Sequence, residues 1–109
     1  MLAVNYDQDY CRLSFPKLMK FNIHNAKEVE QDLMQYICKP HSCVVLDMKS
    51  VAFVDSSAFE CLLNIERNAK IYNAEFRLER VSDDILDIIK VVQLDNVFNI
   101  ITEEESEAS

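Results

Sequence analysis

The segment from Cys43 to Tyr72 constrains the fold more than any other part of the chain. It begins with the apolar run CVVLDM (43–48), continues through a second short run, VAFV (51–54), and then changes to a helical repeat. A continuous apolar run of this length is typical of a strand that is covered on both faces. The change of period predicts two strands, followed at once by a helix near residues 57–73.

Strand and helix patterns alternate along the rest of the chain. Further strands are predicted at 3–6 and 10–15, which flank DQD as a hairpin, and at 75–81 and 97–101. Further helices are predicted near 25–38, where Asn25 and Glu28 resemble a capping box, and near 83–92, where Ser82 is the expected cap. This order predicts an α/β fold, with a mixed sheet of four to five strands and helices packed mainly on one face.

Apolar residues at helical spacing identify the side chains that each helix is expected to bury. They are Ala26, Val29, Leu33 and Ile37 in the first helix; Ala58, Leu62, Ile65, Ala69 and Tyr72 in the second; and Ile85, Ile88, Ile89 and Val92 in the third. The chain contains no glycine. Its turns are therefore expected to use Asn, Asp and Ser, which tolerate tight backbone geometry.

The charge and hydropathy of the chain exclude several classes of function. Lys and Arg total 11 against 19 Asp and Glu, a formal net charge of −8, which argues against direct nucleic-acid binding and against anionic membrane surfaces. No apolar stretch approaches the roughly eighteen residues that cross a bilayer, and the first ten residues do not form a signal peptide. We expect a cytoplasmic protein without membrane insertion. Residues 1–101 should form one domain, and the acidic segment 102–109 should be disordered.

Four cysteines are scattered through the chain without any C-x-x-C pair: Cys11, Cys38, Cys43 and Cys61. Zinc and redox sites use close pairs, because a short turn must direct two sulfur atoms at one point. Free thiols that act as small apolar side chains are the better interpretation. We predict no metal and no cofactor.

Asp55, Ser56 and Ser57 stand where the second apolar run ends and the helix begins. Residues of these types at a helix start are most often caps and turn residues. Ser57 is the expected cap, because Glu60 follows three residues later and completes a capping box. Ser56 then has no structural task. Unpaired backbone N–H groups in a first helical turn favour negative charge, so a phosphate on Ser56 would suit this position.

A catalytic role is the third interpretation of this segment, and the sequence disfavours it. The nucleophile turn of hydrolases needs glycines, and the chain has none. Both His24 and His41 precede the serines, and both are expected to be exposed. Asp47 could be a phosphoacceptor, but it is as easily the end of a strand. We predict that the protein is not an enzyme.

The segment VVLDMKSVAFVDSSAFECLL resembles the central motif of STAS domains, the family of anti-sigma-factor antagonists and of sulfate-transporter cytoplasmic domains. The later segment AEFRLERVSDDILDIIKVVQLDNVFNI is similar to the C-terminal half of that family. Two departures stand out. Ala58 replaces the usual glycine after the serine pair, and FPKLMKF replaces the usual Gly-x-Leu-Asp turn after the hairpin.

The resemblance implies an anti-sigma factor antagonist that acts by partner switching. It assigns phosphorylation to Ser56 and partner binding to Asp55, Ser56, Ser57, Ala58 and Phe59. The implied partners are an anti-sigma factor with serine kinase activity, which binds the unphosphorylated form, and a serine phosphatase that resets the switch. The alternative is a STAS subunit of a phospholipid-transport ATP-binding cassette complex that is not phosphorylated.

Overall fold

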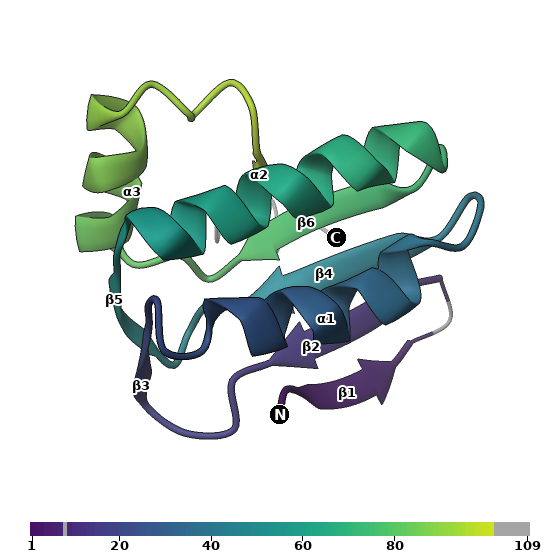
Figure 1. The fold of residues 1–109 in the computed structure, drawn as a ribbon, viewed down its shortest axis with the longest axis horizontal. Helices are drawn as coiled ribbons and strands as arrows, with labels where there is room; N and C mark the ends of the chain where they lie inside the picture. Colours follow the sequence, from purple (N-terminus) through teal and green to yellow (C-terminus); the bar gives the residue numbers. More distant parts are fainter. Residues whose placement is uncertain (8, 102–109) are drawn as a thin grey trace.

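The main sheet contains five strands in the order β1-β2-β4-β6-β7. The computed structural model describes residues 1–7 and 9–101, and the predicted acidic tail lies outside them. The strands are β1 (Ala3–Tyr6), β2 (Cys11–Ser14), β4 (Cys43–Asp47), β6 (Glu75–Glu79) and β7 (Asn99–Ile101). Only the β1–β2 hairpin is antiparallel among these pairs. The predicted mixed sheet and its hairpin are confirmed (Figure 1).

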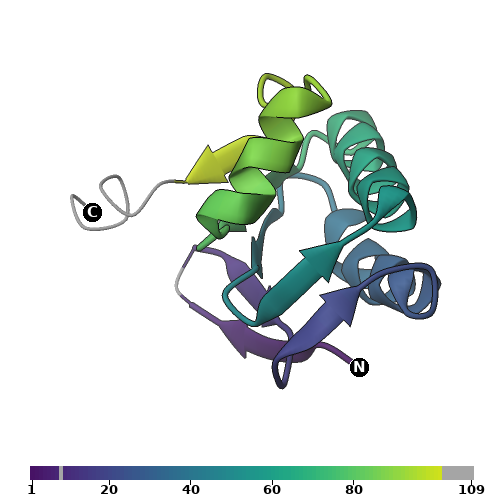
Figure 2. The same ribbon diagram turned by 90° about the vertical axis from the view of Figure 1, so that its left-hand side faces the viewer.

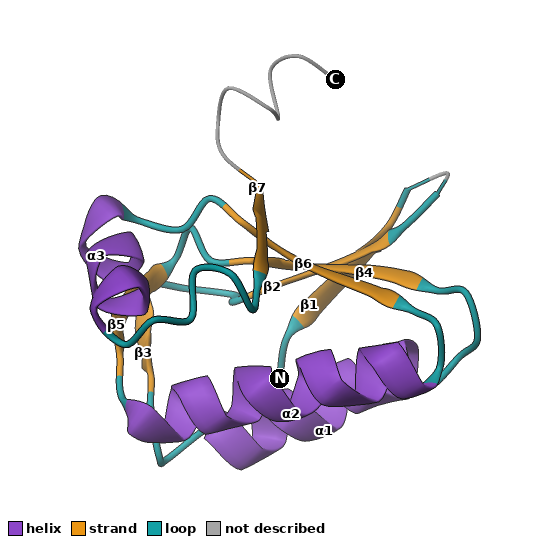
Figure 3. Ribbon diagram, turned by 90° about the horizontal axis from the view of Figure 1, so that it is seen from above, coloured by secondary structure: helices purple, strands orange, loops and turns teal. Residues whose placement is uncertain are grey.

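Two helices cover one face of this sheet. Helix α1 (Ala26–Ile37) and helix α2 (Ser56–Ile71) lie side by side beneath the strands, as Figure 3 shows. Helix α3 (Asp83–Val91) lies at one end of the sheet rather than on its opposite face (Figures 1 and 3). The expectation of helices mainly on one face is confirmed.

A second, two-stranded sheet forms at the end where α3 lies. Strand β3 (Met19–Phe21) pairs in parallel with β5 (Val51–Val54), and Figure 2 shows the two side by side. The sequence predicted a strand in VAFV but did not separate it from the main sheet, and it did not predict β3. Three residues carry too little periodicity to be recognised, and the pairing joins segments far apart in the sequence.

The helices bury most of the side chains that their periodicity selected. All four expected residues of α1 are buried, as are Ala58, Leu62, Ile65 and Ala69 of α2, with Cys61 in addition. Tyr72, Ile88 and Val92 are exposed, so their predicted burial was wrong. Helix α3 buries only Ile85 and Ile89, because it packs at the end of the sheet and presents a narrow face.

Charged side chains cover the face of the sheet that carries no helix. Val45 of β4 is in register with Arg12 of β2 and Arg77 of β6, and only 1% of it is exposed. Arg12 forms an ion pair with Glu79, whose carboxylate is also buried. The stems of long side chains can shield apolar surface in this way. The continuous apolar run therefore reflects a helix layer on one side and a charged layer on the other.

Asp47 belongs to this charged layer, and its environment explains why a strand ends there. Its side chain is 5% exposed. Its Oδ1 accepts a hydrogen bond from the Lys49 backbone at 3.0 Å and another from Arg80 Nε at 3.1 Å, and Arg80 also forms an ion pair with Oδ2. Asp47 was interpreted either as a phosphoacceptor or as the end of a strand, and these contacts agree with the end of a strand.

The turns are made without glycine by residues of four different types. His41, Asn73, Arg80 and Gln93 have positive φ values of 62°, 53°, 51° and 62°. Of these four positions, only Asn73 is of the expected kind. Other turns do use Asn and Asp, as expected: Asn22 Oδ1 accepts from the His24 backbone N–H, and Asp47 Oδ1 accepts from that of Lys49, each at 3.0 Å. Asn73 and Gln93 follow the C-caps of α2 and α3, where the backbone turns into the left-handed region.

All four cysteines are free thiols. Cys11 and Cys61 are buried, while Cys38 and Cys43 are partly exposed. Burial raises the pKa of the Cys61 thiol to about 12, with a smaller contribution from the charge of Glu30. Cys61 therefore behaves as an apolar core residue, as the sequence predicted.

Candidate functional site

Asp55 is the N-cap of α2 and organises the junction between β5 and the helix. Its backbone is extended, and its Oδ1 accepts a hydrogen bond from the Ala58 backbone N–H at 3.0 Å. The helix begins at Ser56, one residue earlier than expected. The prediction that Ser57 caps the helix with Glu60 was therefore wrong. A carboxylate at the N-cap also interacts favourably with the helix dipole.

The second oxygen of Asp55 holds the loop that precedes α1. Oδ2 accepts a hydrogen bond from the Ile23 backbone N–H at 3.0 Å, and the Asp55 backbone N–H donates to Phe21 at 3.3 Å. The single carboxylate thus satisfies donors from two segments. Sequence reasoning could not detect this bridge, because Ile23 and Asp55 are 32 positions apart.

Asn25 closes the same loop instead of capping α1 through its side chain. Its Oδ1 accepts from the Asn22 backbone N–H at 2.9 Å, and its Nδ2 donates to the Lys20 carbonyl at 2.7 Å. No side-chain cap is formed at the start of α1. The predicted capping box of Asn25 and Glu28 was wrong, because both polar groups of Asn25 are used by the loop.

The serines differ in their exposure. Ser56 is exposed, and Ser57 is partly buried. Neither hydroxyl has a hydrogen-bond partner among residues 1–7 and 9–101. Ala58 is fully buried at 0% exposure, and Phe59 is partly buried against the core. Of the five residues predicted to bind a partner, Ser56 is the one that is exposed rather than partly or fully buried.

A groove of about 360 Å³ separates the first turns of α1 and α2. Ser57 lines it together with Ile23, Lys27, Glu60, Cys61 and Asn64. Asn64 donates a hydrogen bond to Glu30 across the two helices at 2.6 Å. The two serines therefore have different surroundings: Ser57 faces the groove between the helices, and Ser56 faces open solvent.

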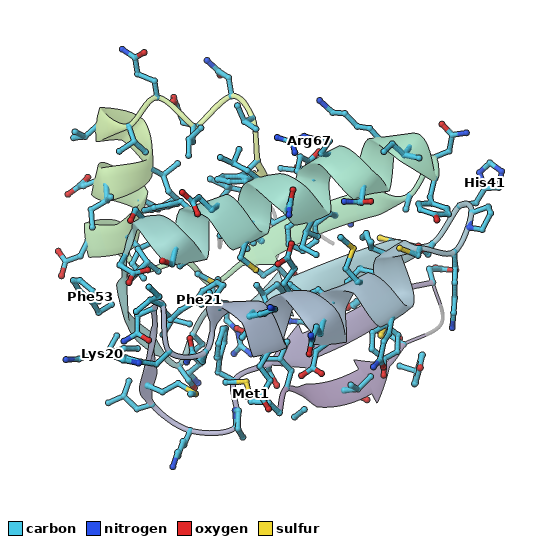
Figure 4. All side chains as sticks on the ribbon, viewed as in Figure 1. Met1, Lys20, Phe21, His41, Phe53 and Arg67 are labelled. Carbon is cyan, nitrogen blue, oxygen red and sulfur yellow. The ribbon has the colours of Figure 1, made fainter. Side chains whose placement is uncertain are left out.

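Apolar side chains are exposed on the β3–β5 sheet and the segments that flank it, which the sequence did not predict. Leu18 is 75% exposed, Ile23 69% and Phe53 49%. Figure 4 shows Phe53 and Lys20 projecting outward at the end of the molecule that carries β3 and β5, while Phe21 points into the core. Exposed apolar side chains that gather in one place mark an interaction surface more often than singly scattered ones do.

Histidines and clusters of metal-ligating side chains are among the groups that catalysis most often uses. His41 lies at the opposite end of the molecule from Phe53 (Figure 4), and both histidines are exposed, as predicted. In the described part of the chain, no group of three or more His, Cys, Asp or Glu side chains is arranged to hold a metal ion. Each helix of residues 1–7 and 9–101 is too short or too polar to span a bilayer.

Comparisons with known proteins agree with this architecture. The family model described as "STAS domain" matches residues 18–108. A putative anti-sigma factor antagonist from Thermotoga maritima is similar in structure, with a TM-score of 0.81 and 20% identity over 98% of this chain and 90% of that chain. A STAS domain protein from Planctomyces limnophilus gives a TM-score of 0.83 and 19% identity, covering 93% of this chain and 89% of that one.

A third solved structure is the Bacillus cell fate determinant SpoIIAA in its phosphorylated form. It gives a TM-score of 0.66 and 13% identity, covering 99% of this chain and 97% of that chain. These identities are low, so the likeness to solved structures establishes the fold. The family model covers most of the sequence, including the β3–β5 sheet and all three helices. The chain belongs to the STAS domain family.

Proposed function

We propose that this protein is a cytoplasmic anti-sigma factor antagonist that works by partner switching. The unphosphorylated form binds an anti-sigma factor that is also a serine kinase. The kinase phosphorylates Ser56, the complex dissociates, and a serine phosphatase restores the binding form. The partner contacts the protein around Asp55, Ser56, Ser57 and Phe59, and Ala58 supports this surface from within the core.

The main support for the proposal is that Asp55, and not Ser56, caps α2, so the Ser56 hydroxyl is not needed for the fold. Asp55 supplies the cap through its bond to the Ala58 N–H, and the exposed Ser56 hydroxyl has no partner in the described structure. A kinase can reach Ser56 without breaking a hydrogen bond that stabilises the fold. Ser57 is partly buried beside the groove, so it is the less accessible of the two hydroxyls.

The electrostatics of the position support phosphorylation as a switch. The first backbone N–H groups of a helix have no partner within the helix, and the helix dipole favours negative charge beside them. A phosphate on Ser56 would add about −1.5 to −2 charge beside Asp55. The phosphate would therefore change the charge of the partner-binding surface, and the N-terminus of α2 would accommodate that negative charge. One of the solved structures that this chain resembles, SpoIIAA of Bacillus, is of a phosphorylated form.

The test is a phosphorylation assay with the purified anti-sigma factor kinase that the protein binds. Mass spectrometry of peptides should locate one phosphate, on Ser56. Ser56→Ala should abolish the modification and leave binding of the unphosphorylated protein within about threefold, because only a hydroxyl is lost. Ser57→Ala is the matched control and should still be phosphorylated.

Two results would contradict the proposal. A phosphate on Ser57 would reassign the acceptor. Stable co-purification with a phospholipid-transport ATP-binding cassette complex, without phosphate on either serine, would replace the switch by the structural-subunit function.

A further inference from the structure

Six exposed residues lie on the β3–β5 sheet or on the segments that flank it, and we name them the β3–β5 surface. They are Lys17, Leu18, Lys20, Ile23, Lys49 and Phe53. Lys20 and Phe53 are register partners in the two-stranded sheet and lie side by side. The Met19 N–H donates to the Ser50 carbonyl at 2.9 Å, which brings the turn of Lys49 beside Leu18. Ile23 adjoins them through its bond to Asp55.

This surface is positively charged on a protein whose net charge is −8. No Asp or Glu occurs between Asp9 and Glu28 in the sequence. Within the described residues, every ion pair uses an arginine or the terminal amino group, so Lys17, Lys20 and Lys49 have none.

The two acidic residues nearest to this surface in the sequence are already engaged. The Asp47 carboxylate is buried and pairs with Arg80. Asp55 holds the Ile23 and Ala58 backbone N–H groups. Neither of these two carboxylates therefore pairs with the lysines of this surface.

Unpaired lysines and exposed apolar residues are each common on protein surfaces. On this surface, lysines and exposed apolar residues are interspersed. Lys17 and Lys20 lie on either side of Leu18 in the sequence, and Lys20 lies beside Phe53 across the two strands. A complementary surface would present apolar side chains surrounded by carboxylates.

We propose that the β3–β5 surface docks a protein segment in which Asp and Glu surround apolar side chains. The inference deepens the proposed function, because it gives the chemistry of the partner, and it rests on that function only for the partner's identity. It also explains how phosphorylation acts. Ser56 follows Asp55 directly, and Asp55 is bonded to Ile23 of this surface, so phosphate charge would repel the acidic segment from its edge.

An anionic membrane is the other partner that lysines and apolar residues could attract. The surroundings argue against it. Helix α3 carries Asp83, Asp84 and Asp87, and it lies beside β5 at the same end of the molecule (Figures 1 and 2). A flat anionic surface large enough to meet the lysines would meet these carboxylates as well, whereas a narrow peptide segment would not.

The experiment is an NMR titration of the ¹⁵N-labelled full chain with a synthetic peptide of alternating glutamate and leucine. At low ionic strength the amide resonances of Leu18, Ile23 and Phe53 should shift. Lys20→Glu should weaken binding of the peptide about tenfold. Lys70→Glu is the matched control: Lys70 is exposed in the last turn of α2, at the other end of that helix from Ser56, and its reversal should change affinity less than about twofold.

Several outcomes would overturn this inference. Equal shifts with a lysine–leucine peptide would show that charge plays no part. Shifts caused by vesicles of anionic lipid but not by the peptide would make the partner a membrane. Loss of the peptide response at higher protein concentration would show that a second copy of the chain occupies the surface. A change in these resonances on deletion of residues 102–109 would show that the acidic tail occupies it. Because the peptide is not an anti-sigma factor, failure of the kinase assay leaves this result interpretable.

Discussion

Asp55 fixes Ile23, a residue 32 positions away, by accepting its backbone N–H at 3.0 Å. The same carboxylate caps α2 through Ala58 at 3.0 Å. The loop before α1 and the first turn of α2, which begins at Ser56, are therefore positioned together. The exposed serine stands on a junction whose geometry depends on the side chain that precedes it.

Asp55→Ala should destabilise the fold by about 1–3 kcal/mol, because it removes an N-cap and a second hydrogen bond to Ile23. Urea denaturation measures the difference. Ser57→Ala is the control and should change the free energy of unfolding by less than about 0.5 kcal/mol, since its hydroxyl has no partner in the described structure. A loss for Ser57→Ala as large as that for Asp55→Ala would show that Ser57 is the cap after all.

The sequence was sufficient for the elements whose periodicity extends over several turns or a full strand. Helices α1 and α2 follow directly from the spacing of apolar residues, and the burial of β4 follows from its continuous apolar run. The sequence was insufficient for β3, which has three residues, and for the separation of β5 from the main sheet. Both depend on pairing between distant segments, which leaves no local pattern.

The candidate site was predicted in part for the same reason. The junction at Asp55, Ser56 and Ser57 can be recognised in the sequence, because the apolar pattern of a strand ends there and that of a helix begins. Which of the three residues caps the helix depends on the direction in which the chain leaves β5 and on the loop at Ile23. The exposure of Phe53 could not be foreseen, because this residue lies in an apolar run that suggests burial.

Gln93→Gly should stabilise the protein by up to about 1 kcal/mol. Gln93 has a φ of 62°, where a side chain is unfavourable and glycine is not, although glycine also increases the entropy of the unfolded chain. Thermal unfolding followed by circular dichroism should show a higher Tm. The backbone bond from the Leu94 N–H to the Ile89 carbonyl, 2.9 Å, should be kept. A lower Tm would mean that the Gln93 side chain stabilises the fold by more than the strain of its positive φ destabilises it.

Thiol labelling should separate the four cysteines by burial. Cys61 has a pKa of about 12 because it is buried, so almost none of it is thiolate at pH 8, and iodoacetamide should leave it unmodified in the folded protein. Cys38 and Cys43, which are partly exposed, should react before Cys61.

The burial of Cys61 also predicts a pH dependence of stability. The unfolded chain ionises its thiols near pH 8.5 while folded Cys61 does not, so the free energy of unfolding should fall as pH rises above about 9. Rapid labelling of native Cys61 would contradict its placement in the core.

Glu66→Gln should stabilise the protein at neutral pH. Burial raises the pKa of the Glu66 carboxyl, the charge of Lys70 opposes this rise in part, and Oε2 is buried without a hydrogen-bond partner in the described structure. A raised pKa in the folded state means that the protonated form is favoured, so this contribution to stability is present in acid and lost as pH rises through the folded pKa. The gain from Glu66→Gln should therefore be present at pH 7, below about 1 kcal/mol because the residue is only partly buried, and should disappear near pH 4. The exposed Glu60→Gln should show no such pH-dependent difference.

Ser56→Asp should separate stability from binding. At the first position of α2 a carboxylate interacts favourably with the helix dipole, although it adjoins Asp55, so the free energy of unfolding should change by less than about 0.5 kcal/mol. Binding of the anti-sigma factor should weaken by more than tenfold, about 1.4 kcal/mol, because a charge enters the centre of an interface that accommodates a neutral hydroxyl. Ser57→Asp, which faces the groove between α1 and α2, should weaken binding less. Isothermal titration calorimetry with each variant compares the affinities, and urea denaturation of the same samples compares the stabilities. Wild-type affinity for Ser56→Asp would remove phosphorylation control from the proposed function, whereas equal losses of affinity and stability would show that the substitution acts through the fold.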